Sequence, residues 1–200
     1  MSTEFSTSED YLTESEQALL LKIARDTLTE YLADRSLPGL DTYTLTDTLR
    51  ELHGAFVTLR NRGELRGCVG YAANLEPLAR AVQLNTVNAA AHDCRFAPVT
   101  LAEAPSITIE ISALGHGDTP EKPFKRVHDL SEIVIGRDGL YIEQPPMRGG
   151  ILLPQVAVEQ GWGVAQFLSA VCRKAGYPDG AWRLAEYKLY RFTAQHFAEV

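Results

Sequence analysis

Two β-prone runs flank a turn in the segment Ala55-Phe56-Val57-Thr58-Leu59-Arg60-Asn61-Arg62-Gly63-Glu64-Leu65-Arg66-Gly67-Cys68-Val69-Gly70. The residues 61–64 between the runs have turn chemistry, which predicts a hairpin of strands 55–60 and 65–70. Side chains alternate between the two faces of a strand. We therefore expect Leu65 and Val69 on the core face, and Arg66 and Cys68 together on the opposite face.

Helices are predicted on both sides of this hairpin. Thr13 and Glu16 have the spacing of a capping box, which predicts a helix from Thr13 to about Ala33. Asn74 is the expected cap of a second helix that runs toward Asp93, with Pro77 in its first turn.

The rest of the chain alternates between strand and helix patterns without regular βαβ order. The predicted elements are a strand over 106–113, a second hairpin of 133–135 with 140–142, a strand over 151–153 followed by Pro154 at a first helical position, a helix over 164–175 and a strand over 184–192. Strand pairs mixed with helices favour the α+β class, with a largely antiparallel or mixed sheet and packed helices.

Composition limits the class of protein. The chain has 200 residues, 45% of them hydrophobic, and a net charge of −7, which permits one large domain or two lobes and does not favour a nucleic-acid partner. No apolar run approaches about 18 residues, so no membrane span is predicted. The three cysteines are far apart in sequence, and the N-terminus lacks the order of a secretory signal, which together favour a cytoplasmic protein. Residues 1–12 are expected to form a flexible tail.

The first candidate site is the cysteine motif around Arg66 and Cys68. On a regular strand these side chains lie about 7 Å apart on one face. A cation beside a thiol favours the reactive thiolate, and Gly67 and Gly70 permit close approach of a ligand. The alternative is structural, because cysteine often serves as a small buried hydrophobe and glycine can mark a bulge.

Two further sites are less specific. Asp93 and Arg95 lie at the end of the second helix, where they could bind a ligand or close the helix with a salt bridge. Two residues at this spacing on a helix do not face each other, so we expect each to have a different partner. Gln155 follows the glycine-rich junction 149–154, which is typical either of an anion site or of a tight connection between strand and helix.

No metal or cofactor is predicted. The sequence contains no HExxH, CxxC, GxxxxGK[ST], GxGxxG or GxSxG pattern. The alternative is a metal site built from residues that are distant in sequence.

Four motifs together resemble the AMMECR domain family, whose prokaryotic members are called AmmeMemoRadiSam system protein A. They are Phe56-Val57-Thr58-Leu59, Leu65-Arg66-Gly67-Cys68-Val69-Gly70, Asp93-Cys94-Arg95-Phe96-Ala97-Pro98 and Leu153-Pro154-Gln155-Val156-Ala157. The resemblance extends from about Thr13 to Val200, with Val69 in place of the more usual isoleucine. It implies a single α+β domain over 13–200, with two lobes around a cleft, and Arg66 and Cys68 near that cleft. It also implies association with a Memo-like protein and a radical-SAM protein.

Three functional hypotheses stay open. The first is an enzyme in which Cys68 is the nucleophile or redox thiol, Arg66 activates it or holds an anionic substrate, and Gly67, Gly70, Asp93, Arg95 and Gln155 bind the ligand. The second is a non-catalytic adaptor for the Memo-like and radical-SAM partners. The third is a purely structural role for the motif.

Overall fold

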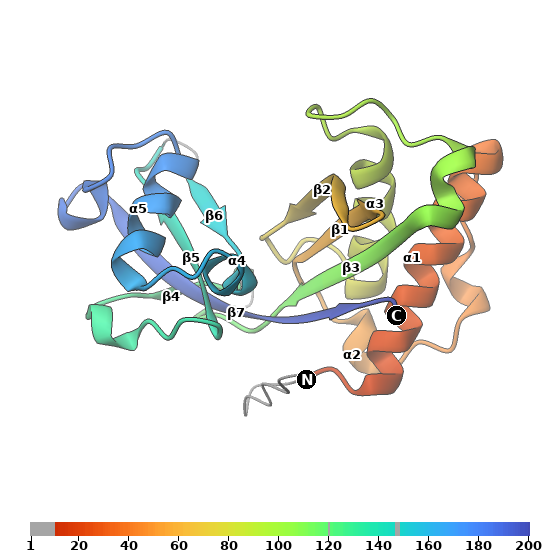
Figure 1. Cartoon of the computed structure of the whole chain (residues 1–200). Helices are drawn as coiled ribbons and strands as arrows, with labels where there is room; N and C mark the ends of the chain where they lie inside the picture. The colour runs from red at the N-terminus through yellow and green to blue at the C-terminus, as the bar shows by residue number, and fades with distance from the viewer. Residues whose placement is uncertain (1–10, 120, 147–148) are drawn as a thin grey trace. The chain divides into compact units, whose positions relative to one another are not determined.

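The computed structural model describes residues 11–119, 121–146 and 149–200, which divide into two compact units (Figure 1). The N-terminal unit comprises residues 11–114 and 195–200, and the C-terminal unit comprises residues 115–194. The elements of the N-terminal unit are α1 (Glu14–Asp34), the 3-10 helix η1 (Leu40–Thr42), α2 (Asp47–Arg50), β1 (Ala55–Asn61), β2 (Glu64–Tyr71), α3 (Leu78–Ala91), the 3-10 helix η2 (Leu101–Ser106) and β3 (Ile107–Leu114).

The predicted hairpin forms the edge of the sheet in the N-terminal unit. Its strands lie in the order β2-β1-β3, both pairings are antiparallel, and Arg62 and Gly63 make the turn with positive φ angles of 53° and 87°. Leu59 pairs with Gly67 but Arg60 pairs with Leu65, so Arg66 is the additional residue of a β-bulge. The bulge makes the prediction for Leu65 wrong: Leu65 lies on the face opposite the core and is 37% exposed.

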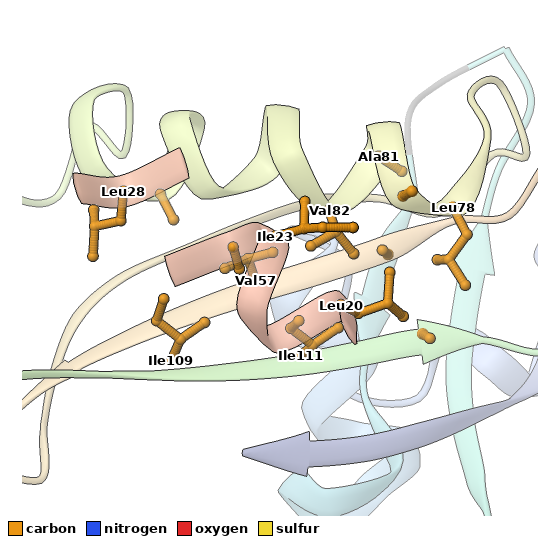
Figure 2. Packing of buried hydrophobic residues seen from close by; sticks show 14 of the residues in the cluster. Leu20, Ile23, Leu28, Val57, Leu78, Ala81, Val82, Ile109 and Ile111 are labelled. Atoms are coloured by element: carbon orange, nitrogen blue, oxygen red, sulfur yellow. The ribbon is translucent and has the colours of Figure 1, made fainter. Parts of the chain in front are cut away.

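Helices α1 and α3 cover one face of this sheet (Figure 2). Strict alternation turns Ile109 and Ile111 of β3 toward the helices, next to Val57 of β1, and all three side chains are fully buried. Each contributes about 1.5–3 kcal/mol through burial. The helices complete this core with aliphatic side chains that Figure 2 labels: Leu20, Ile23, Leu28, Leu78, Ala81 and Val82.

The helix boundaries agree only in part with the sequence predictions. The capping box of Thr13 and Glu16 is confirmed, and α1 ends at Asp34. The predicted cap at Asn74 is wrong, because α3 begins at Leu78 with Pro77 at its cap, and the Asn74 side-chain oxygen instead accepts the Gly54 N–H at 3.0 Å. The Asn74 side chain, which the sequence pattern assigns to the start of α3, therefore binds the backbone of Gly54 instead.

The C-terminal unit has its own strands, helices and hydrophobic core. Its strands lie in the order β7-β5-β6, and β4 pairs with β7; every pairing of β4, β5 and β6 is antiparallel. Phe167, Leu168 and Val171 of α5 pack in a core with Leu140 and Ile142 of β5. The elements are β4 (Lys125–Arg126), the 3-10 helix η3 (Leu130–Glu132), β5 (Asp138–Glu143), β6 (Gly150–Leu152), α4 (Pro154–Glu159), α5 (Val164–Lys174), the 3-10 helix η4 (Ala181–Arg183) and β7 (Lys188–Ala198), whose residues from 195 onward belong to the N-terminal unit.

Two predicted strands differ from the structure. Residues 133–135 form no strand, because the buried carboxylate of Asp138 accepts the Val134 N–H at 2.8 Å and the Arg137 guanidinium at 2.7 Å. This loop replaces the second predicted hairpin, and β5 pairs with β6 and β7 instead. The final strand begins at Lys188 rather than at residue 184, since a helical turn precedes it.

The predicted α+β class with antiparallel strands is confirmed. Of the predicted tail 1–12, the first ten residues lie outside the described part of the chain, whereas Leu12 is 4% exposed and belongs to the N-terminal core. Among the described helices, none has both the length and the apolar character required to cross a membrane.

Candidate functional site

The Cys68 thiol lies on the sheet face opposite α1 and α3. The hairpin register pairs Thr58 with Cys68 and Val57 with Val69, and Val57 faces the helical core. Paired residues of antiparallel strands share a face, so Thr58 and Cys68 lie together on the other side. The Thr58 hydroxyl donates to Cys68 Sγ at 3.3 Å, and the cysteine is half-buried.

Arg66 is the additional residue of the bulge, so strand alternation does not determine the face on which its side chain lies. Its Nε donates to Glu103 Oε1 at 2.8 Å, and its Nη1 donates to the Ala97 carbonyl at 2.8 Å. The Arg66 side chain is 17% exposed. Hydrogen bonds from Arg66, and next from the Thr100 N–H, lower the pKa of Glu103 to about 2. Arg66 therefore holds the chain that follows α3 against the hairpin.

Asp93 and Arg95 form a bidentate ion pair at the edge of β2. Arg95 Nε donates to Asp93 Oδ1 at 2.9 Å and its Nη2 donates to Oδ2 at 2.6 Å, so the expectation that the two would find separate partners is wrong. The reason is that α3 ends at Ala91, and both residues lie in the turn beyond it. The hydrogen bond from Arg95 holds the pKa of the Asp93 carboxyl well below its usual range.

The same ion pair binds the backbone of Cys68. Asp93 Oδ2 accepts the Cys68 N–H at 2.9 Å, and Arg95 Nη2 donates to the Cys68 carbonyl at 3.3 Å. These groups occupy the outer side of an edge strand, where a further strand would otherwise form its hydrogen bonds. The Asp93 side chain is 6% exposed and that of Arg95 is 48% exposed, so only the arginine presents much of its surface to solvent.

Gly67 and Gly70 serve close packing. A Cβ on Gly67 would lie 2.1 Å from the carbonyl oxygen of Ala89 in α3, and a Cβ on Gly70 would lie 2.4 Å from the Phe56 ring and from the Ala55 carbonyl. Gly67 therefore lets the helix approach the strand, and Gly70 lets an aromatic ring lie across the strand.

Gln155 belongs to a different part of the fold. It lies in α4 of the C-terminal unit, whereas Arg66, Cys68, Asp93 and Arg95 all belong to the N-terminal unit.

Two residues of this cluster escaped the sequence analysis. Thr58 lies in a predicted strand, but its contact with Cys68 depends on the bulged register. The glycine at position 67 is compatible with a bulge and does not by itself give that register. Glu103 lies 37 residues from Arg66, although its spacing from Thr100 is that of a capping box, which the structure contains.

The arrangement presents one thiol on a rigid strand. Its backbone is fixed by Asp93 and Arg95, its sulfur accepts from Thr58, and the strand beneath it packs directly on α3 through Gly67. A side chain held in this manner is pre-organised for reaction or for ligand binding. The side chains of Arg66 and Asp93 are mostly buried. Their polar atoms form hydrogen bonds with other groups of the protein: Arg66 with Glu103 and Ala97, and Asp93 with Arg95 and the Cys68 N–H.

Comparison with known proteins gives consistent results. The AMMECR1 family model matches residues 21–197. A protein of Thermofilum pendens is 41% identical over 94% of this chain and 92% of its own length, and one of Methanocaldococcus jannaschii is 41% identical with the same coverage. The crystal structure of the uncharacterized protein PH0010 from Pyrococcus horikoshii superimposes with a TM-score of 0.80 at 36% identity, covering 90% of both chains.

Proposed function

This chain belongs to the AMMECR1 family, and we propose that it binds a small electrophilic ligand on the sheet face that bears Cys68, with the Cys68 sulfur as the reacting atom. The observation that carries the proposal is the hydrogen bond from Thr58 to a half-buried sulfur, on a strand whose backbone is fixed at that residue. A nucleophile with a fixed position loses little entropy when its substrate binds.

The polar groups around Cys68 divide into two roles. Arg66 and Asp93 are positioning residues, because their bonds hold the hairpin, the turn after α3 and the Cys68 backbone together. The half-exposed Arg95 is the cation whose guanidinium bonds the Cys68 carbonyl, and it supplies the charge for an anionic group on the ligand.

Competitive alkylation of the three cysteines tests this function. Cys94 is exposed, Cys68 is half-buried and Cys172 is fully buried, so accessibility alone would give labelling rates in the order Cys94, Cys68, Cys172. We expect iodoacetamide at neutral pH to alkylate Cys68 faster than Cys94, as measured by mass spectrometry. Burial raises the pKa of the Cys172 thiol, so this residue should label only after unfolding.

Thr58→Val is the matched variant, because it keeps the shape of the side chain and removes the hydroxyl. It should slow labelling of Cys68 by about fivefold, the equivalent of one hydrogen bond worth about 1 kcal/mol, and leave Cys94 unchanged. Labelling that follows accessibility alone, with no response to Thr58→Val, would refute the reactive thiol.

A second candidate is the adaptor for Memo-like and radical-SAM proteins. The observation in its favour is a group of large apolar side chains exposed on the N-terminal unit: Leu52, Tyr71 and Leu75 are 51%, 50% and 71% exposed. Tyr71 and Leu75 border the same hollow, which His53 and Leu84 also line. Exposed apolar groups that gather around a hollow are typical of protein-binding surfaces.

Co-purification with each of the two proposed partners tests the adaptor function. Leu75→Asp should reduce recovery of a bound partner at least about tenfold, since a charge would have to be desolvated in the contact. Leu101→Asp is the control, because Leu101 is 53% exposed and lies elsewhere on the same unit, in η2. Equal recovery with both variants would argue against this surface, and no recovery with the unaltered chain would end the adaptor hypothesis.

A further inference from the structure

A cluster of aromatic side chains covers one face of the sheet in the C-terminal unit. Leu140 and Ile142 of β5 enter the core under α5, so Tyr141 between them points to the opposite face. The register places Tyr190 of β7 directly opposite Tyr141, and Arg126 of β4 opposite Tyr190 on its other side. Three strands therefore contribute to one row of side chains.

Phe124, which precedes β4, lies on this row. Its ring stacks parallel to Tyr141, with centroids 4.3 Å apart and an interplanar angle of 3°, and its centroid is 6.0 Å from that of Tyr190. Gly149 packs beneath Tyr141, where a Cβ would lie 2.7 Å from the ring. We call Phe124, Tyr141, Tyr190 and Arg126 the aromatic platform; all four side chains are half-buried.

Both phenol hydroxyls of the platform form hydrogen bonds within the protein. Tyr141 and Tyr190 donate to the two carboxylate oxygens of Glu143 at 2.9 and 3.2 Å. Burial, followed by the hydrogen bond to Glu143, raises the pKa of Tyr141 to about 12, so this hydroxyl remains a donor at neutral pH. Glu143 thus holds both tyrosine rings in place, and the Tyr141 ring in turn supports the stacked ring of Phe124.

Arg126 supplies the charge. Its guanidinium lies over the Tyr190 ring, 5.2 Å from the centroid. Its Nη1 is buried and has no hydrogen-bond partner within the part of the chain that the structure describes. Buried donors are almost always bonded in folded proteins, and Arg126 as a whole is half-buried, so its charge lies close to the surface of the platform.

We propose that the aromatic platform binds a planar heteroaromatic compound that carries a phosphate group. The ring of the ligand stacks on the half-buried ring of Phe124, and its phosphate pairs with the Arg126 guanidinium. Aromatic side chains on a sheet are a general platform for stacking nucleobases, and the arginine fork matches the geometry of phosphate oxygens. The platform belongs to the C-terminal unit, and the proposal is independent of any reaction at Cys68.

Isothermal titration calorimetry of the full chain with adenosine monophosphate, adenosine and inorganic phosphate tests the proposal. Adenosine monophosphate should bind at least about tenfold more tightly than either part alone, because only the complete molecule uses both the rings and the charge. Arg126→Gln should lower its affinity to that of adenosine. Arg126→Lys keeps the charge but loses the two parallel N–H donors of the guanidinium, so its affinity for adenosine monophosphate should be intermediate. Phe124→Leu should weaken the binding of adenosine and of adenosine monophosphate alike.

Arg183→Gln is the matched control, because Arg183 lies over the ring of Trp182 in the same unit, 4.2 Å from the centroid, away from the platform. It should leave binding unchanged, as should Cys68→Ser. A thermal melt of each variant without ligand establishes that it is folded. The proposal is overturned if adenosine monophosphate gives no binding up to millimolar concentration, if inorganic phosphate binds as tightly, or if Arg183→Gln weakens binding as much as Arg126→Gln.

Discussion

Replacing Gly67 with alanine is expected to lower the free energy of unfolding by about 2–3 kcal/mol, with the loss in the N-terminal unit. The added Cβ would lie 2.1 Å from the carbonyl oxygen of Ala89 and 3.1 Å from its carbonyl carbon. Both are backbone atoms of α3, so no side chain can rotate away, and either the helix or β2 must shift. Because α3 ends two residues before Asp93, the same shift should loosen the carboxylate from the Cys68 N–H.

Urea unfolding followed by far-UV circular dichroism measures the loss of stability, and the alkylation rate of Cys68 reports the loosened contact. Gly163→Ala is the control, since Gly163 has an ordinary φ of −83° and the nearest atom to an added Cβ is 3.7 Å away. If Gly67→Ala unfolds at the same urea concentration as the unaltered chain, the close contact between β2 and α3 does not exist in solution.

Replacing Asp138 with alanine should cost about 3–5 kcal/mol, the range observed when one partner of a buried ion pair is removed. The Asp138 side chain is fully buried, accepts from the Arg137 guanidinium at 2.7 and 3.2 Å, and lies 3.8 Å from that of Arg191. It also accepts the Val134 N–H at 2.8 Å. Alanine removes the acceptor for all of these groups at once, in the segment that orders the start of β5.

Tryptophan fluorescence in urea is the appropriate measurement, because both tryptophans of the chain, Trp162 and Trp182, lie in the C-terminal unit. Asp138→Asn is the matched variant: it keeps an oxygen for the Val134 N–H and loses the charge, so it should cost less than alanine. A fluorescence transition for Asp138→Ala within about 1 kcal/mol of the unaltered chain would show that the buried pair contributes little net stability.

The elements that the sequence predicts well depend on neighbouring residues. Thr13 and Glu16 satisfy each other within one helical turn, and Ile109 and Ile111 occupy alternate positions of a strand that needs one apolar face. Pro154 occurs at the first position of α4, where its missing N–H has no cost. Where the prediction is wrong, a polar side chain binds a backbone group that the local pattern does not indicate. Asn74 binds the Gly54 N–H, and Asp138 binds the N–H of Val134, which was assigned to a hairpin.

The same contrast between local and distant contacts applies to the candidate site. Its location at the cysteine motif was predicted from the sequence, but the partner of each charged residue was not. Arg66 bonds Glu103 and the chain after α3, and the cation that bonds the Cys68 backbone is Arg95. A single extra residue in β2 changes the hairpin register, because it reverses the face of the preceding Leu65 and places Cys68 opposite Thr58.

By itself, the sequence determined the α+β class, most helices and strands, and the motif in which the thiol lies, since apolar periodicity and capping act over a few residues. Only the tertiary structure decided which polar groups meet: Thr58 with Cys68 through the bulged register, Asp93 with the edge of β2, and Arg66 with Glu103. These contacts join residues 10, 25 and 37 positions apart. They form because a buried or edge polar group must be bonded, and the fold determines which partner is within reach.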